Sequence, residues 1–139
     1  MPMFLSYTWY SEARRMFYLR VHINHTNLLD SEHLSGIDGE YHFNSSGPFR
    51  EMFDKIVELA DHYSCTHIIT PRDSINDIIT RELHYLDKYR VCVTPIKLDH
   101  RRILRMLADE KNESMAKVIA RHFFSYRPEM ILVEPLKFA

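Results

Sequence analysis

The residues from Ser46 to Leu98, SGPFREMFDKIVELADHYSCTHIITPRDSINDIITRELHYLDKYRVCVTPIKL, alternate between two hydrophobic patterns that decide the fold. Apolar residues recur at helical spacing over 49–63, and the short apolar run at 66–70 that follows predicts a buried strand. Both patterns then repeat, with a helix expected over 71–86 and a strand over 91–98. This alternation is typical of parallel strands, because each helical crossover covers one face of the sheet.

Two strand-to-helix turns in this stretch carry residues that begin helices. Ser46 is placed to cap the first helix, with Pro48 in its first turn. Thr70 is placed to cap the second helix, with Pro71 at the first helical position and Asp73 where a capping box needs an acid. We therefore expect sharp helix starts at both turns.

The same two turns are candidate anion sites, because ligands of parallel α/β sheets bind where strands lead into helices. The first turn contains Ser45, Ser46 and Gly47, and the second runs from Thr70 to Ser74. An acid already lies in the second turn, so the first is the better candidate. Ordinary helix capping explains both turns without a ligand.

Residues 99–125 predict either one long helix or two shorter ones. Asp99 is placed to cap this stretch. The apolar stripe loses its phase across 109–114 and resumes at Met115, and its first part consists of Ile103, Leu104 and Leu107. Pro95 predicts a bulge or sheet edge in the preceding strand, and a last buried strand is expected at 130–133.

The first 45 residues predict strands. Residues 16–25 alternate between apolar and polar side chains, as a half-buried strand does. Residues 4–10 are aromatic and predict a partner strand, residues 40–44 a third short strand, and residues 27–39 a loop. We therefore predict a single three-layer α/β domain over residues 1–139, with antiparallel N-terminal strands and a parallel βαβαβ C-terminal part in one mixed sheet.

The amino-acid composition limits the kinds of protein that this chain is expected to be. The 139 residues include 18 Lys plus Arg and 19 Asp plus Glu, which leaves a net charge of −1 and no global field to attract nucleic acid. Two cysteines, Cys65 and Cys92, do not form a disulfide framework, so we expect a reducing, cytoplasmic compartment. No apolar run reaches the roughly 18 residues of a membrane span, and the N-terminus lacks the order of a secretion signal.

Histidine and cysteine residues raise two site hypotheses. His22, His25 and His33 invite a metal site, but residues three apart on a strand point to opposite faces, so we expect no metal. Cys65 and His67 are two apart, would share a strand face, and would form a thiolate nucleophile if the histidine activated the thiol. A buried, inert thiol is the favoured interpretation.

Arg101, Arg102 and Arg105 form a basic cluster at the start of the third long helical stretch. Such a cluster would grip phosphate or nucleic acid. Asp99 lies beside the cluster, more acids follow at 109–110, and no aromatic residue interleaves it, so a solvated helix face is favoured.

The order of elements from Glu40 to Leu98 resembles the second half of the GNAT acyltransferase superfamily, and the stretch PFREMFDKIVELADHYSCTHIITPRDSINDIITREL is similar in pattern to acyl-homoserine-lactone synthases. The resemblance implies that Ser45, Ser46 and Gly47 hold the pyrophosphate of acyl-CoA, with Glu40 or His42 as general base. The family's Arg/Gln-Gly-x-Gly signature is absent and the N-terminal part is short, so the implied acyl-CoA site is degenerate.

We expect a small non-catalytic protein, an adaptor, inhibitor or assembly factor, that needs no cofactor and acts through a protein-interaction surface or by self-association. The N-terminal aromatics Phe4, Tyr7, Trp9, Tyr10, Phe17 and Tyr18 are typical interface anchors if they are exposed, and they fit a place in the core equally well. The alternative is a reduced GNAT-like N-acyltransferase. A weaker alternative is a nucleic-acid binder that uses the Arg101, Arg102 and Arg105 face.

Overall fold

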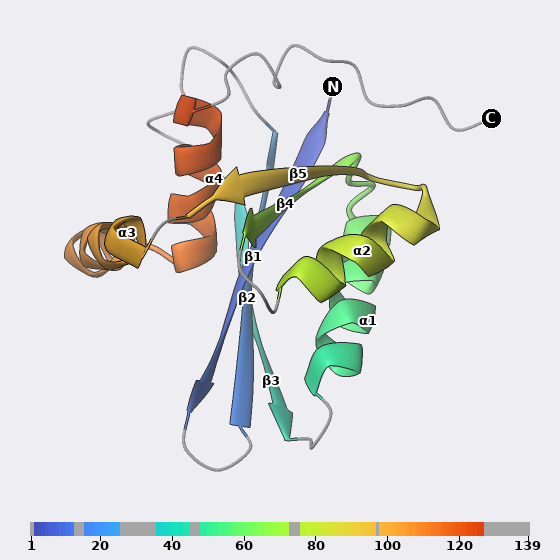
Figure 1. The fold of residues 1–139 in the computed structure, drawn as a ribbon, viewed down its shortest axis with the longest axis horizontal. Helices are drawn as coiled ribbons and strands as arrows, with labels where there is room; N and C mark the ends of the chain where they lie inside the picture. The colour runs from blue at the N-terminus through green and yellow to red at the C-terminus, as the bar shows by residue number, and fades with distance from the viewer. Residues whose placement is uncertain are drawn as a thin grey trace.

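A computed structural model describes residues 2–12, 16–25, 36–44, 48–72, 76–96 and 98–126 (Figure 1). In chain order its elements are β1 (Met3–Glu12), β2 (Met16–His25), β3 (Ile37–Asn44), α1 (Pro48–His62), β4 (His67–Arg72), α2 (Asn76–Leu86), β5 (Arg90–Pro95), α3 (Leu98–Lys111) and α4 (Met115–Tyr126).

The strands form one mixed sheet in the order β3-β2-β1-β4-β5. β1 pairs antiparallel with β2, and β2 antiparallel with β3. β1 also pairs in parallel with β4, and β4 in parallel with β5. The predicted α/β class, with antiparallel N-terminal strands and parallel C-terminal strands, is confirmed. The strand predicted at 130–133 lies outside the described residues.

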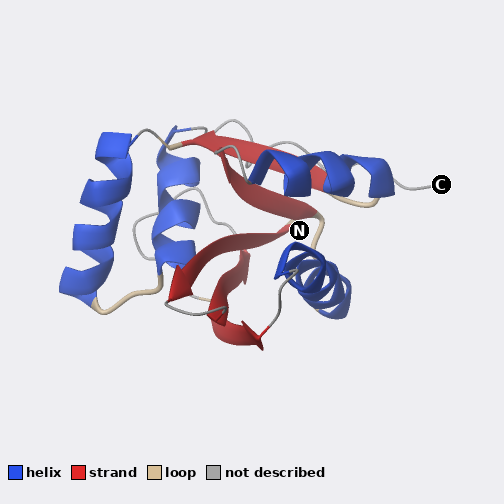
Figure 2. Ribbon diagram, turned by 60° about the horizontal axis from the view of Figure 1, so that its bottom comes forward, coloured by secondary structure: helices blue, strands red, loops and turns tan. Residues whose placement is uncertain are grey.

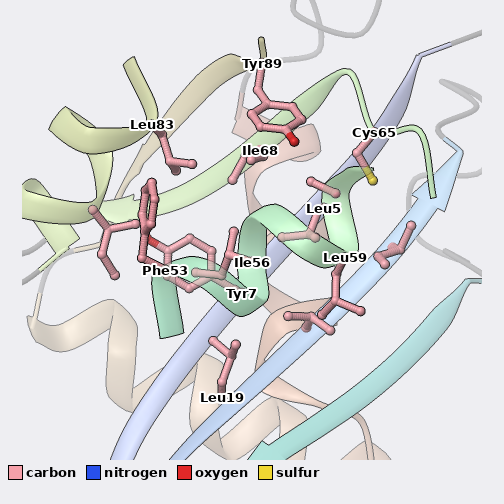
Figure 3. Packing of buried hydrophobic residues seen from close by; sticks show 14 residues of the cluster. Leu5, Tyr7, Leu19, Phe53, Ile56, Leu59, Cys65, Ile68, Leu83 and Tyr89 are labelled. Carbon is pink, nitrogen blue, oxygen red and sulfur yellow. The ribbon is translucent and has the colours of Figure 1, made fainter. Parts of the chain in front are cut away.

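Helices cover both faces of the sheet (Figure 2). α1 and α2 lie on one face, and their core includes Ile56 and Leu83 packed against Leu5 and Ile68 (Figure 3). α4 covers the other face, where Phe123 packs with residues of β1, β4 and β5. α3 lies on the outer side of α4, away from the sheet (Figures 1 and 2).

β2 is buried more deeply than the alternating pattern predicted. Its polar face was expected to meet solvent, yet His22 and Asn24 are 0% and 2% exposed. The reason is α4, whose Ala116 and Ala120 are small enough for close approach to the sheet. Ser6 Oγ on the same face donates a 2.7 Å hydrogen bond to the Ala116 carbonyl, so this buried hydroxyl has its partner on α4.

The helix start predicted at Thr70 is wrong. Thr70 and Pro71 continue β4, where they pair with residues of β5, and α2 begins only at Asn76. The pairing of β1 with β4 ends at Ile69, so Pro71, which has no N–H, interrupts no hydrogen bonding between β4 and β1. The pairing with β5 outweighs the local preference of Thr-Pro for a helix start. Asp73 lies outside the described residues.

Strand boundaries also differ from the prediction at two places. β3 begins at Ile37, inside the expected loop, because Asp38 pairs with His22 across the ladder and accepts a 2.9 Å hydrogen bond from its ring. Gly39 fits this strand because the Tyr41 ring lies 3.0 Å from where a Cβ would be. β5 ends at Pro95 rather than at residue 98, and among the described strands it lies at the edge of the sheet, one of the two alternatives that Pro95 predicted.

Of the two alternatives for residues 99–125, the structure has two helices. Asn112, with φ 56°, ends α3, and the Glu113 N–H returns to the Ala108 carbonyl at 2.9 Å. Ser114 then caps α4 by accepting a 3.2 Å hydrogen bond from the Lys117 N–H. The loss of hydrophobic phase in the sequence marks this turn. α3 begins at Leu98, so Asp99 lies inside the helix.

Three described helices end on a left-handed residue that is not glycine. These are Ser64 after α1, Asp87 after α2 and Asn112 after α3, with φ between 52° and 56°. The 2.8 Å bond from the Cys65 N–H to the Ala60 carbonyl completes a Schellman motif after α1.

We expect Ser64→Gly to raise the free energy of unfolding by about 1 kcal/mol, because glycine adopts this conformation without the steric cost that serine bears. Urea denaturation measures the change. Asn112→Gly is the matched comparison and should gain less, since asparagine tolerates the left-handed region. An unchanged or lowered stability of Ser64→Gly would contradict this account of the α1 terminus.

Candidate interaction surface

α3 is held to the molecule along one narrow side. Leu104 and Ala108, four residues apart, are 7% and 2% exposed and join the core beneath α4. The helix packs mainly against α4. The rest of its circumference therefore faces away from the described part of the protein.

Apolar side chains occupy this outward side. Ile103 is 53% exposed, Met106 57% and Leu107 37%. They lie at positions i, i+3 and i+4, so they form a continuous patch on the helix. Single exposed apolar residues are ordinary, but a cluster of large ones points to an interaction.

Charge along α3 runs against the helix dipole. Arg101 and Arg102 lie near the start of the helix, where the dipole disfavours cations, and Arg105 lies just past its middle. Asp109 and Glu110 lie near its end, where acids are disfavoured, although Lys111 follows them. All of these side chains are exposed. Arg105 and Asp109 carry opposite charges four residues apart, which offsets part of this cost. A contact outside the helix gives a physical reason for the rest of the charge order.

Neither Arg102 nor Arg105 has an ion pair in the described part of the chain. We define the α3 surface as these two arginines, the apolar patch and the two acids that follow, that is Arg102, Ile103, Arg105, Met106, Leu107, Asp109 and Glu110.

The sequence pattern placed Ile103 and Leu107 on a buried stripe, which is wrong, because α4 contacts only the side that carries Leu104 and Ala108. Met106 was not singled out.

An open cleft of about 410 Å³ lies beside the end of α3, between β3 and the turn into α4. Its lining includes Asp38, Glu40, Asp109 and Glu113. Asp38 accepts hydrogen bonds from His22 and from Ser114, and Glu113 is paired with Arg121. The carboxylates are thus largely matched by donors within the protein.

The candidate general bases Glu40 and His42 lie on one face of β3, exposed and near each other. Glu40 Oε1 accepts a 3.1 Å hydrogen bond from the Tyr10 hydroxyl and lies 3.6 Å from Arg20 Nε and 3.7 Å from His42 Nε2. The candidate cofactor residues Ser45, Ser46 and Gly47 lie outside the described residues. The acyltransferase site therefore stays a prediction.

Cys65 and His67 do not form a catalytic pair. Cys65 packs into the core beneath α1, whereas the His67 ring lies 4.5 Å from the Phe4 ring, in the core beneath α4. Burial raises the pKa of the Cys65 thiol to about 12, so the thiol stays protonated at neutral pH. Cys65 and Cys92 are both free and buried, and the favoured interpretation of an inert thiol fits this environment.

The histidines of β2 lie apart, as the strand geometry predicted. His22 is buried and His25 is exposed, while His33 lies outside the described residues. Burial lowers the pKa of His22, and its hydrogen bond to Asp38 partly opposes this shift. Within the described ranges no three His, Cys, Asp or Glu side chains come together as metal ligands would.

Of the two alternatives for the N-terminal aromatics, the structure supports a place in or against the core. Phe4 and Tyr7 are fully buried, and Trp9, Tyr10, Phe17 and Tyr18 are partly buried. The Trp9 indole and the Tyr7 hydroxyl donate to Asn76 Oδ1 at 3.2 and 3.4 Å, and Tyr10 stacks on Tyr18. The aromatic residues lie on both faces of the strands, and helices cover both faces of the sheet, which explains the burial.

Of the helices in the described ranges, none has the length and apolar character needed to cross a membrane.

Comparisons with known proteins leave the family open. No protein-family model and no curated protein matches the chain. The chain is similar to the Fowlpox virus resolvase, solved with its substrate Holliday junction DNA, at 13% identity and a TM-score of 0.45, over 92% of this chain and 98% of that one. It is also similar to a chain of a simian T-cell lymphotropic virus intasome in complex with the PP2A regulatory subunit B56 gamma, at 12% identity and a TM-score of 0.39, over 88% of this chain and 46% of that one. At such identities and TM-scores neither likeness assigns a function.

Proposed function

We propose that this chain is a small, non-catalytic binding protein that recognises a protein partner through the α3 surface. The observation that carries the proposal is the exposed patch of Ile103, Met106 and Leu107 beside Arg102 and Arg105, which have no ion pair in the described residues. An apolar centre flanked by charge is the usual anatomy of a protein interface.

Burial of this patch would supply the affinity. Each Å² of apolar surface removed from water is worth about 25 cal/mol, and large side chains such as Met106 and Ile103 contribute most of it. Arginine is enriched at interfaces because its planar group pairs with carboxylates through two hydrogen bonds. The charges at the rim set the orientation and the choice of partner more than the affinity.

A photo-crosslinking amino acid at Met106 tests the proposal in the cells that produce the protein. We expect a discrete protein adduct, because the side chain lies in the contact. The matched control places the same crosslinker at Tyr85 of α2, which is 78% exposed but lies outside the α3 surface, and should give no such adduct. Equal labelling at both positions, or none at Met106, would reject the proposal.

Nucleic acid is the second candidate partner, and Arg102 and Arg105, which are exposed and have no ion pair with the described residues, favour it. Asp109 and Glu110 on the same helix oppose a polyanion, which is why we prefer a protein. In the crosslinking experiment this candidate predicts a nuclease-sensitive adduct at Met106. The absence of nucleic acid, which the net charge favoured, likewise stays a prediction.

A further inference from the structure

We propose that the partner of the α3 surface is a second copy of this chain, with the two α3 helices packed antiparallel about a twofold axis. The inference rests on the proposed function, because it needs the same surface to be a contact. It goes further by naming the occupant. Such an interface uses one patch on both copies, so the patch has to be complementary to itself.

The charge order along α3 has this self-complementarity. The basic residues precede the acidic ones, so turning a second helix end for end sets the basic half of each copy against the acidic half of the other. Arg102 and Asp109 are seven residues apart, hence two turns, and lie on the same side of the helix. In an antiparallel pair centred between Arg105 and Met106, Arg102 of one copy lies level with Asp109 of the other, and the twofold axis makes this contact twice.

Apolar residues fill the centre of the same pairing. Met106 lies at the midpoint, and Ile103 and Leu107 lie within one turn of it. All three are exposed in the single chain. The pairing would therefore bury an apolar centre between two ion pairs. A wholly acidic partner or a nucleic acid would instead meet Asp109 and Glu110 beside the arginines, with like charges facing each other.

The size of the surface indicates a weak dimer. α3 has 14 residues, which makes it about 21 Å long, and one helix pair of this length is at the small end of specific interfaces. We expect a dissociation constant on the order of 10–100 μM, which is typical of transient association.

Analytical ultracentrifugation of the full chain tests the inference. We expect a monomer–dimer equilibrium in the wild-type protein. Arg102→Asp and Asp109→Arg each place like charges at both symmetric contacts, so each should raise the dissociation constant by about tenfold or more. An equimolar mixture of the two variants should form a heterodimer with near wild-type affinity, because both contacts again join opposite charges. Arg81→Asp, an exposed arginine on α2, is the matched control and should dimerise as the wild type does.

Circular dichroism identifies any charge variant that has lost its fold. In that case Met106→Glu tests the interface independently, because it places a charge in the apolar centre and should also weaken dimerisation. A wild-type chain that stays monomeric up to about 1 mM, ten times the upper limit of the expected range, would overturn the inference. So would a mixture that fails to restore association. If the Met106 crosslink in cells joins a different protein while the chain is monomeric, the proposed function stands and the second copy is rejected. No protein adduct at all rejects both.

Discussion

Phe4→Ala should lower the free energy of unfolding by about 3–5 kcal/mol, the range for removing a buried phenylalanine. Phe4 is fully buried, and its ring lies 4.9 Å from the Phe124 ring in an edge-to-face arrangement and 4.5 Å from the His67 ring. The residue joins α4 to the centre of the sheet, so a cavity there weakens both. Domains of this size are stable by only about 5–15 kcal/mol, so the variant should lose a large share of that stability.

Thermal and urea denaturation measure this loss, and the melting temperature should fall by roughly 10–20 °C. Tyr85→Ala is the control, since Tyr85 is 78% exposed and its truncation should change stability by no more than about 0.5 kcal/mol. A loss below about 1 kcal/mol in Phe4→Ala would contradict the core described beneath α4.

Mild acid should destabilise the fold through His67. The ring is fully buried, with Nδ1 2.8 Å from Thr66 Oγ1 and Nε2 without a partner among the described residues. Burial, with the nearby positive charge of Arg90, lowers the pKa of His67 to about 4 from the ordinary 6.5. Between these two values the unfolded chain binds the proton and the folded protein does not.

This difference in protonation between the folded and unfolded states decides how stability changes with pH. At pH 7 neither state is protonated at His67, and stability is lost as the pH falls through 6.5 toward 4, by about 3 kcal/mol in total. Burial lowers the pKa of His22 as well, so it acts in the same direction. Urea titrations at pH 7, 6 and 5 measure the slope. His67→Asn should reduce the dependence of stability on pH. His62→Asn, at an exposed histidine, is the control and should leave this dependence unchanged. A wild-type stability that is constant from pH 7 to 5 would rule out the mechanism.

The sequence was sufficient to predict helices that bury one face and strands that are buried on both faces. The stripe from Met52 to Ala60 and the apolar runs of β4 and β5 each correspond to an observed element. The ends were less predictable, because Thr70 and Pro71 follow the pairing with β5 rather than their local preference. The polar residues of β2 show the same limit, since nothing local in the alternating pattern reveals that α4 will cover His22.

The α3 surface was only half predictable. The arginines were visible as a cluster, but Ile103 and Leu107 had the spacing of a buried stripe, and periodicity alone does not say which side of a helix meets the core. A usable signal was present in the charge order, since basic residues before acidic ones oppose the helix dipole. Conversely, the aromatic N-terminus had the composition of an interface and lies largely in or against the core, because the sheet is covered on both faces.

The pairing of β1 with β4 has a consequence for synthesis of the chain. β1 and β2 follow each other directly, but β1 meets β4 only through Phe4–Ser6 and His67–Ile69, which are 63 positions apart. At about 5–20 residues per second, a ribosome needs roughly 3–12 s to make the intervening chain. The parallel edge of β1 is therefore open for seconds in every nascent chain, a period in which unpaired strand edges invite association with other chains.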